Sequence, residues 1–215
     1  MRLTEPRFRQ VALPSIDAYG YLTTRQIVLL LGLGTSQRSV DRHLRQAHAE
    51  GLVIRLAGHF GVTCWMLSRR GQRLHSQDSL PLPKVSGHAA RHTHVAAEVG
   101  IRLTLGGHTV ISDRQNRAAR GYKGTCWPDL VINGQGGASG RPQAIEVELV
   151  RKRKVDLCDK LVDYKLPSSP YSGVVYFCGD RNLASFIEEM ATLVGAEHRV
   201  QTIILSHALL DSAIL

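Results

Sequence analysis

Cysteine is scarce in this sequence, and its copies are far apart. They stand at Cys64, Cys126, Cys158 and Cys178, so no two of them form the CxxC pair used by zinc ribbons. This spacing excludes a zinc ribbon and favours reduced thiols, as in a cytoplasmic protein. Three of the four fall in strand-like stretches, where we expect small buried thiols.

Long apolar runs are also lacking. No apolar stretch approaches the roughly 20 residues that a membrane-spanning helix needs. The first ten residues, MRLTEPRFRQ, contain no apolar segment of the kind found in secretory signals. We therefore expect a cytoplasmic globular protein with no membrane partner. The length of 215 residues suits one large domain or two small ones.

Acidic residues are outnumbered by basic ones. The chain has 27 Lys and Arg against 18 Asp and Glu, which gives a net charge of +9. Residues 1–87 carry +7 of this charge and residues 88–215 only +2. A positive excess favours a polyanionic partner, nucleic acid before membrane. We expect the first part to bind DNA and the second to use its acids for another purpose.

Cap residues divide the first part into helices and strands. Thr23 can cap one helix, whose apolar run ends at a glycine, and Ser36 can cap the next. The pattern predicts helices over about 7–18, 24–31 and 37–51, then strands over 52–58 and 63–68. A short basic stretch, RRGQRLH, follows the second strand.

The third predicted helix has an apolar face and a basic face. Apolar residues recur at i, i+4 and i+7 from Val40. Arginines have the same spacing displaced by two residues, about 200° of helix rotation, and so project from the opposite side. This basic triplet consists of Arg38, Arg42 and Arg45. Arginine can bond a guanine edge or hold phosphates, so we expect the triplet to lead the binding of double-stranded DNA.

The order of these elements resembles the winged-helix family of DNA-binding domains. The resemblance covers roughly residues 8–78 and implies that the arginine helix is the recognition helix. A charged, solvated helix face on a protein-interaction domain has the same pattern, and this alternative stays open.

A proline-containing stretch separates the two parts of the chain. Two prolines fall within three residues, which predicts a linker over residues 79–87 between domains at 1–78 and 88–215. Beyond it we expect helices over 88–106, 155–166 and 183–195 and strands over 108–112, 127–132, 143–150, 173–178 and 200–205. The expected fold class is α/β (α+β), with a mixed sheet in the second domain.

Acidic residues mark two neighbouring predicted strands. Asp129 follows Pro128 in the first strand, and Glu146 and Glu148 lie in the second. Residues i and i+2 of a strand point to one face, so both glutamates can face the side of Asp129. Hard oxygen ligands of this kind suit Mg²⁺ or Mn²⁺.

This motif and its surrounding elements resemble the PD-(D/E)XK nuclease superfamily over about residues 88–206. The resemblance implies that Asp129 and Glu146 bind a divalent metal, which polarises the scissile phosphate and lowers the pKa of an attacking water. It also implies a further metal ligand in the first helix, where Glu98 matches. Carboxylates that converge without a cation repel one another, so a metal is expected where they meet.

One motif position departs from the superfamily. Its third residue is usually lysine, and here it is Glu148. Some restriction enzymes of the superfamily carry Glu there and remain active. The change removes the positive charge that orients water, a role that Lys152 or Lys160 can take over. The predicted catalytic residues are Asp129, Glu146, Glu148 and Lys152.

An ordinary hairpin explains the same residues. The segment AIEVELV alternates apolar and acidic residues, as an edge strand with solvated acids does. On this interpretation Asp129 only terminates a strand. Both interpretations stay open.

A basic segment, RQNRAARGYKG (114–124), reads as a mobile loop beside the expected site. Arg117, Arg120 and Lys123 are its candidates for phosphate contact, and a plain solvated loop explains them equally well.

The pairing of a winged helix with a nuclease-like domain resembles the replication-relaxation family of mobile-element proteins. Besides the domain order, the residues PD, EVE and KLVDYK (160–165) match that family. The resemblance implies a bacterial plasmid or integrative element and a role in DNA processing or regulation. Two functions follow: a metal-dependent endodeoxyribonuclease, or a non-enzymatic regulator that reads an operator as a homodimer.

Overall fold

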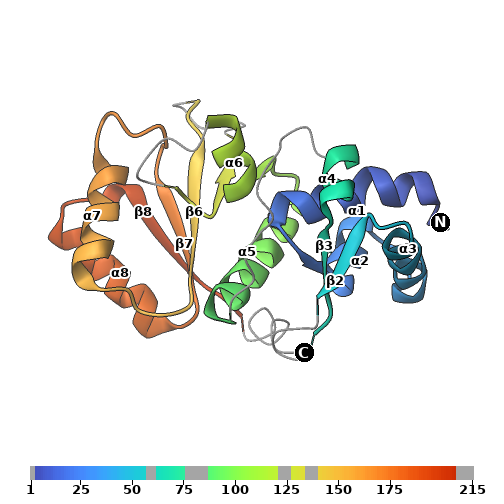
Figure 1. Cartoon of the computed structure of the whole chain (residues 1–215). Coiled ribbons are helices and arrows are strands. Elements are labelled where there is room, and N and C mark those ends of the chain that lie inside the picture. Colours follow the sequence, from blue (N-terminus) through green and yellow to red (C-terminus); the bar gives the residue numbers. More distant parts are fainter. Residues whose placement is uncertain (1–2, 57–61, 76–86, 121–126, 134–139, 207–215) are drawn as a thin grey trace. The chain divides into compact units, whose positions relative to one another are not determined.

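The computed structural model describes residues 3–56, 62–75, 87–120, 127–133 and 140–206 (Figure 1). It is a mixed α/β protein whose contacts form two compact units, residues 1–105 and 106–212. The predicted linker at 79–87 lies almost wholly outside the described residues. No helix in the described ranges is long and apolar enough to cross a membrane.

The first unit combines helices with a small antiparallel sheet. Strand β3 lies between β1 and β2 and pairs antiparallel with both. The elements are α1 (Glu5–Tyr19), β1 (Leu22–Thr23), α2 (Thr24–Leu31), α3 (Gln37–Ala49), β2 (Val53–Leu56), β3 (Cys64–Leu67), α4 (Arg69–His75) and α5 (Gly87–Leu105). The helices and strands predicted here are confirmed, except that residues 57 and 58 of the first predicted strand lie outside the described residues. Helix α4 forms where the sequence suggested only a basic stretch.

The predicted caps are present. Thr23 Oγ1 accepts the backbone N–H of Gln26 at 3.2 Å, and Gln26 Oε1 accepts the N–H of Thr23 at 3.0 Å. This reciprocal pair is a capping box, which satisfies two backbone donors at the start of α2. Ser36 Oγ accepts the N–H of Ser39 at 3.3 Å and starts α3 in the same manner.

Helix α5 packs within the first unit. Its Ala97 and Ile101 belong to the apolar core formed by α1, α2 and α3. Tyr21 Oη donates to the carbonyl of Ala90 at 2.5 Å, and Gln26 Nε2 donates to the carbonyl of His94 at 3.0 Å. The sequence analysis assigned residues 88–105 to the second domain. The predicted boundary between the domains, before residue 88, stays a prediction.

The second unit is built on a five-stranded mixed sheet in the order β4-β5-β6-β7-β8. Strands β4, β5 and β6 pair antiparallel, whereas β7 runs parallel to both β6 and β8. The elements are β4 (Val110–Ser112), α6 (Asp113–Arg120), β5 (Leu130–Ile132), β6 (Gln143–Glu148), α7 (Lys154–Lys165), β7 (Val174–Cys178), α8 (Arg181–Leu193), the short helix η2 (Glu197–Arg199) and β8 (Val200–Ile204).

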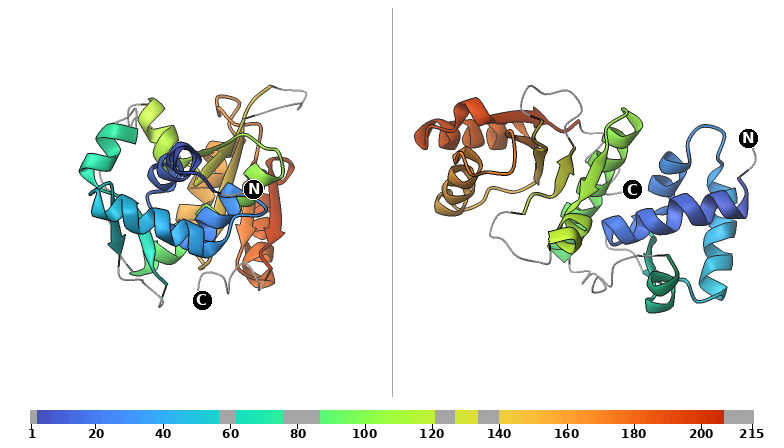
Figure 2. Two further views of the ribbon diagram at one scale, coloured as in Figure 1. Left: turned by 90° about the vertical axis from the view of Figure 1, so that its right-hand side faces the viewer. Right: turned by 90° about the horizontal axis from the view of Figure 1, so that it is seen from above.

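Helices α7 and α8 lie side by side and cover one face of this sheet (Figures 1 and 2). Their apolar residues, including Leu161 and Ile187, form one core with Val174 and Tyr176 of β7. Side chains of β6 that point to this face therefore meet α7.

Helix α6 corrects the prediction of a loop over 114–124. Ser112 Oγ accepts the N–H of Gln115 at 3.2 Å, and Gln115 Oε1 accepts the N–H of Ser112 at 3.0 Å. A second capping box thus starts α6. The helix could not be recognised by apolar periodicity, because the residues that follow Ser112 are almost all polar. Residues 121–124 of the expected loop lie outside the described residues.

Candidate functional site

The strand register of the second unit brings three carboxylates into one row. Leu130 of β5 pairs with Ile145 of β6, so one further step places Asp129 opposite Glu146. On the other side of β5 the register continues to Asp113, whose N–H donates to the carbonyl of Asp129 at 2.9 Å. Asp113, Asp129 and Glu146 therefore share one level across three neighbouring chain segments.

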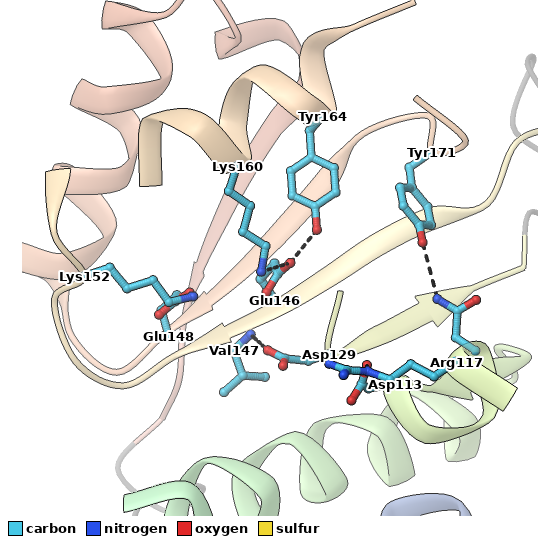
Figure 3. Close-up of polar contacts among 11 residues, drawn as sticks. Asp113, Arg117, Asp129, Glu146, Val147, Glu148, Lys152, Lys160, Tyr164 and Tyr171 are labelled. Atoms are coloured by element: carbon cyan, nitrogen blue, oxygen red, sulfur yellow. Dashed lines mark hydrogen bonds and ion pairs between the residues drawn. The ribbon is translucent and has the colours of Figure 1, made fainter. Parts of the chain in front are cut away.

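Glu146 is the buried centre of this row, with 1% of its surface exposed. Its Oε1 lies 2.7 Å from Lys160 Nζ and accepts a hydrogen bond from the Tyr164 hydroxyl (Figure 3). Lys160 and Tyr164 are four residues apart on α7, so both project from the helix face that lies over β6. The pKa of Glu146 is raised to about 7. Burial is the main cause and the charge of Asp129 adds to it, whereas Lys160 and Tyr164 lower the pKa.

Asp129 is held in place by the neighbouring strand. Its Oδ2 accepts the backbone N–H of Val147 at 2.8 Å (Figure 3). Burial is the main cause that raises the pKa of Asp113, and the charge of Asp129 adds to it, whereas Arg117 and Lys160 lower it. The three carboxylates and Lys160 thus act on one another electrostatically.

Glu148 is also buried, with 4% of its surface exposed, and forms an ion pair with Lys152. Strand β6 lies between β5 and β7, so Glu146 and Glu148 are on a central strand. The interpretation of AIEVELV as an edge strand with solvated acids is therefore wrong. In the structure, the predicted catalytic Lys152 forms its ion pair with Glu148. Lys160, the other candidate, forms an ion pair with Glu146.

Glu98 lies on α5 in the first unit. Its side chain is buried, and its Oε1 accepts hydrogen bonds from Arg102 Nε at 3.1 Å and Nη2 at 3.0 Å. Its role as a metal ligand beside Asp129 stays a prediction.

The arginine face of α3 is as the spacing predicted. The opposite face, with Val40 and Leu44 at its centre, is buried in the core of the first unit. The exposed basic residues are Arg38, Arg42 and Arg45. Arg45 Nε donates to the carbonyl of Asp41 at 3.2 Å, so it stays close to the helix surface.

Arg117 lies on α6, at the same edge of the sheet as the carboxylate row. Its Nε donates to Asp113 Oδ1 at 2.6 Å, and its guanidinium carbon lies 5.8 Å from the ring centroid of Trp127. The other two predicted phosphate contacts, the side chain of Arg120 and all of Lys123, lie outside what the structure describes.

The carboxylate row offers oxygen ligands of the kind that divalent metals prefer. Among the described residues, no group of three or more His, Cys, Asp and Glu side chains is arranged to hold a metal ion. Asp129 and Glu146 still supply two hard carboxylate donors on adjacent strands, which is the ligand chemistry that Mg²⁺ and Mn²⁺ prefer. In the structure, the cation present on Glu146 is Lys160.

Sequence reasoning missed two members of this site. Tyr164 follows Lys160 by four residues on a predicted helix, and that spacing could have placed it beside the same carboxylate. Asp113 follows the predicted strand 108–112 directly, so its position at the strand end was a usable signal. Comparisons add no further site residues, because no family model, curated protein or solved structure matches this chain.

Proposed function

We propose that this chain is a DNA-binding protein of a bacterial plasmid or integrative element. Its first unit is a winged-helix domain that binds duplex DNA. Its second unit is a PD-(D/E)XK-type domain that cleaves phosphodiester bonds with Mg²⁺ or Mn²⁺. The observation that carries the proposal is the burial of Glu146 opposite Asp129. Lys160 Nζ lies 2.7 Å from Glu146 Oε1.

The first unit supports the DNA-binding half of the proposal. Capped helices α2 and α3 precede the β2–β3 hairpin, which is the order of a helix-turn-helix followed by a wing. Helix α3 directs its exposed arginines away from the core. The excess of +7 in residues 1–87 has the sign that phosphate binding needs.

The second unit supports the nuclease half. An antiparallel β4–β5–β6 arrangement is followed by the parallel strand β7, and α7 connects β6 to β7. In this order Asp129, just before β5, lies opposite Glu146 of β6 at one level of the sheet, which supports a metal site of the superfamily's type.

The chain's own residues divide the work of such a site. Asp129 and Glu146 would hold the metal, which supplies a polarised phosphate and an activated water. The N–H of Val147 orients Asp129, and Tyr164 orients Glu146. The motif position that usually holds lysine is Glu148 here, and Lys160 supplies a positive charge at Glu146 instead. There it can stabilise negative charge on the reacting phosphate.

The non-enzymatic regulator is the second candidate, and a specific observation favours it. Glu146 and Glu148 already have cationic partners within the chain, Lys160 and Lys152. Each buried acid thus already has a positive charge of the chain itself beside it. In this case the winged helix reads an operator as a homodimer, and the second unit contributes dimer or DNA contacts.

Cleavage of supercoiled plasmid with Mg²⁺ or Mn²⁺ separates the two candidates. We expect the wild-type chain to nick or linearise the plasmid and Asp129→Asn and Glu146→Gln to abolish this. Glu189→Gln removes an exposed acid on α8 and serves as the matched control. Absence of cutting, with equal DNA binding by all four proteins, would establish the regulator.

A further inference from the structure

The pair Arg117–Asp113 holds a guanidinium group in a defined orientation. Both residues lie in the first two turns of α6, four positions apart, with Arg117 Nε 2.6 Å from Asp113 Oδ1. The guanidinium also faces the Trp127 ring, with 5.8 Å from its central carbon to the ring centroid. A carboxylate and an aromatic ring together restrict a side chain that is otherwise one of the most mobile.

The hydrogen bond of Arg117 determines which of its guanidinium nitrogens can bind a ligand. Within the described residues, its recorded hydrogen bond uses Nε alone. The terminal Nη1 and Nη2 groups therefore remain for a ligand, and this fork matches two oxygens of a phosphate. Arg117 has 40% of its side-chain surface exposed, so a ligand can reach it.

The position of the pair relates it to the carboxylate row. Asp113 is the outer member of that row, and its N–H bonds the carbonyl of Asp129. Trp127 precedes Asp129 by two residues. Asp113 and Trp127 thus connect Arg117 to the segment that carries Asp129, the first expected metal ligand.

We propose that Arg117 binds a backbone phosphate of the DNA strand held at the carboxylate row, and that Asp113 and Trp127 are positioning residues for it. This inference rests on the proposed function, because it needs DNA to reach the second unit. It assigns roles to two residues that no sequence motif marks. The ligand group is a phosphodiester, recognised by charge and by the geometry of the fork.

If the ion pair has no role in positioning Arg117, the variant Asp113→Asn should change DNA affinity in the opposite direction. An exposed i,i+4 pair of this type stabilises a helix by only about 0.3–0.5 kcal/mol. If Asp113 merely neutralised Arg117, then Asp113→Asn would add net positive charge and strengthen DNA binding. If Asp113 positions Arg117, the same variant weakens binding despite the more favourable charge.

The experiment measures binding of a labelled duplex to the full chain by fluorescence anisotropy, in EDTA, at several salt concentrations. Arg117→Gln should weaken binding about five- to tenfold and lower the slope of log K against log salt by about 0.9, the value for one phosphate contact. Asp113→Asn should weaken binding about threefold or more, with Arg117 still present. Circular dichroism melting confirms that each variant is folded.

The pair Arg153–Asp156 provides the matched control. It joins an arginine and an aspartate three residues apart at the start of α7, at 2.7 Å and largely exposed. Asp156→Asn removes the same charge from a similar pair and should leave binding unchanged or slightly tighter.

The outcomes separate this inference from the proposed function. Unchanged affinity and slope for Arg117→Gln, or tighter binding by Asp113→Asn, would overturn the inference while DNA binding itself stands. No binding by the wild-type chain would overturn both. Binding that depends on Arg117 in a chain that does not cut plasmid would support the phosphate contact and reject only the nuclease.

Discussion

At the scale of single residues, Glu146 poses the main energetic question. A carboxylate buried on a central strand loses its hydration, and pairing with Lys160 compensates this loss only in part. Replacement of both members of such a pair by apolar residues of similar volume is often neutral or stabilising. A buried ion pair is therefore weak evidence for a role in stability, and a perturbed acid beside a second acid favours a role in function.

The raised pKa of Glu146 predicts how stability depends on pH. In the unfolded chain this group has the ordinary value of 4.5, and in the folded protein the pKa is about 7. The folded state binds this proton more tightly than the unfolded chain does. The proton's contribution to the free energy of unfolding is therefore full below pH 4.5 and is lost as pH rises through 7. The free energy of unfolding of wild type relative to Glu146→Gln should fall by about 2–3 kcal/mol between pH 5 and pH 8.

Urea unfolding at several pH values measures this difference. Glu189→Gln, which removes an exposed acid, serves as the control and should show no such trend. A wild-type minus Glu146→Gln difference that stays constant from pH 5 to pH 8 would contradict a raised pKa at this position.

At the scale of elements, local signals predicted most of the fold. Thr23 and Ser36 are cap residues followed by apolar periodicity, so the helices after them could be predicted from neighbouring residues alone. Helix α6 was missed because RQNRAAR has almost no apolar side chains to show a period. Its signal was the Ser112–Gln115 capping box, which is a motif of only two residues.

The candidate site shows where local reasoning ends. Alternation in AIEVELV establishes that Glu146 and Glu148 share a face, but it is the same for edge and central strands. The central position of β6 depends on β7, which begins 26 positions after Glu148 and pairs with β6 from Ala144 to Glu148. Such long-range pairing leaves no mark on the residues of β6 themselves.

Helix α3 carries the prediction that belongs to this scale. If it is the recognition helix, replacing Arg38, Arg42 or Arg45 singly by Gln should weaken binding to duplex DNA. An arginine that contacts phosphate should lower the salt slope by about 1, and one that contacts a base should cost about 1–3 kcal/mol for its preferred sequence. Gel shifts over a range of salt concentrations measure both effects.

Arg181→Gln is the control for this series, because Arg181 is exposed and lies on α8 in the second unit. If the three α3 variants bind DNA as tightly as this control, the arginine face serves another partner. The alternative of a protein-interaction domain would then be preferred.

At the scale of the whole molecule, charge and acidity are divided between the two units. Residues 1–87 hold most of the net charge of +9 and the exposed arginines of α3. The second unit holds the buried Glu146 and Glu148 and the lysines that pair with them. The nuclease proposal requires such an arrangement, with a strongly basic unit that binds DNA and a second unit that holds buried carboxylates.

Everything in that proposal depends on whether Asp129 and Glu146 bind a divalent ion. Calorimetric titration of the full chain with Mn²⁺ at pH 8, where Glu146 is mostly ionised, measures this without any substrate. We expect one bound ion per chain, with affinity reduced about tenfold or more in both Asp129→Asn and Glu146→Gln and unchanged in Glu189→Gln. If the wild-type chain takes up no Mn²⁺, or if the acid variants bind it equally well, Lys160 is the permanent partner of Glu146 and the second unit is not a metal-dependent nuclease.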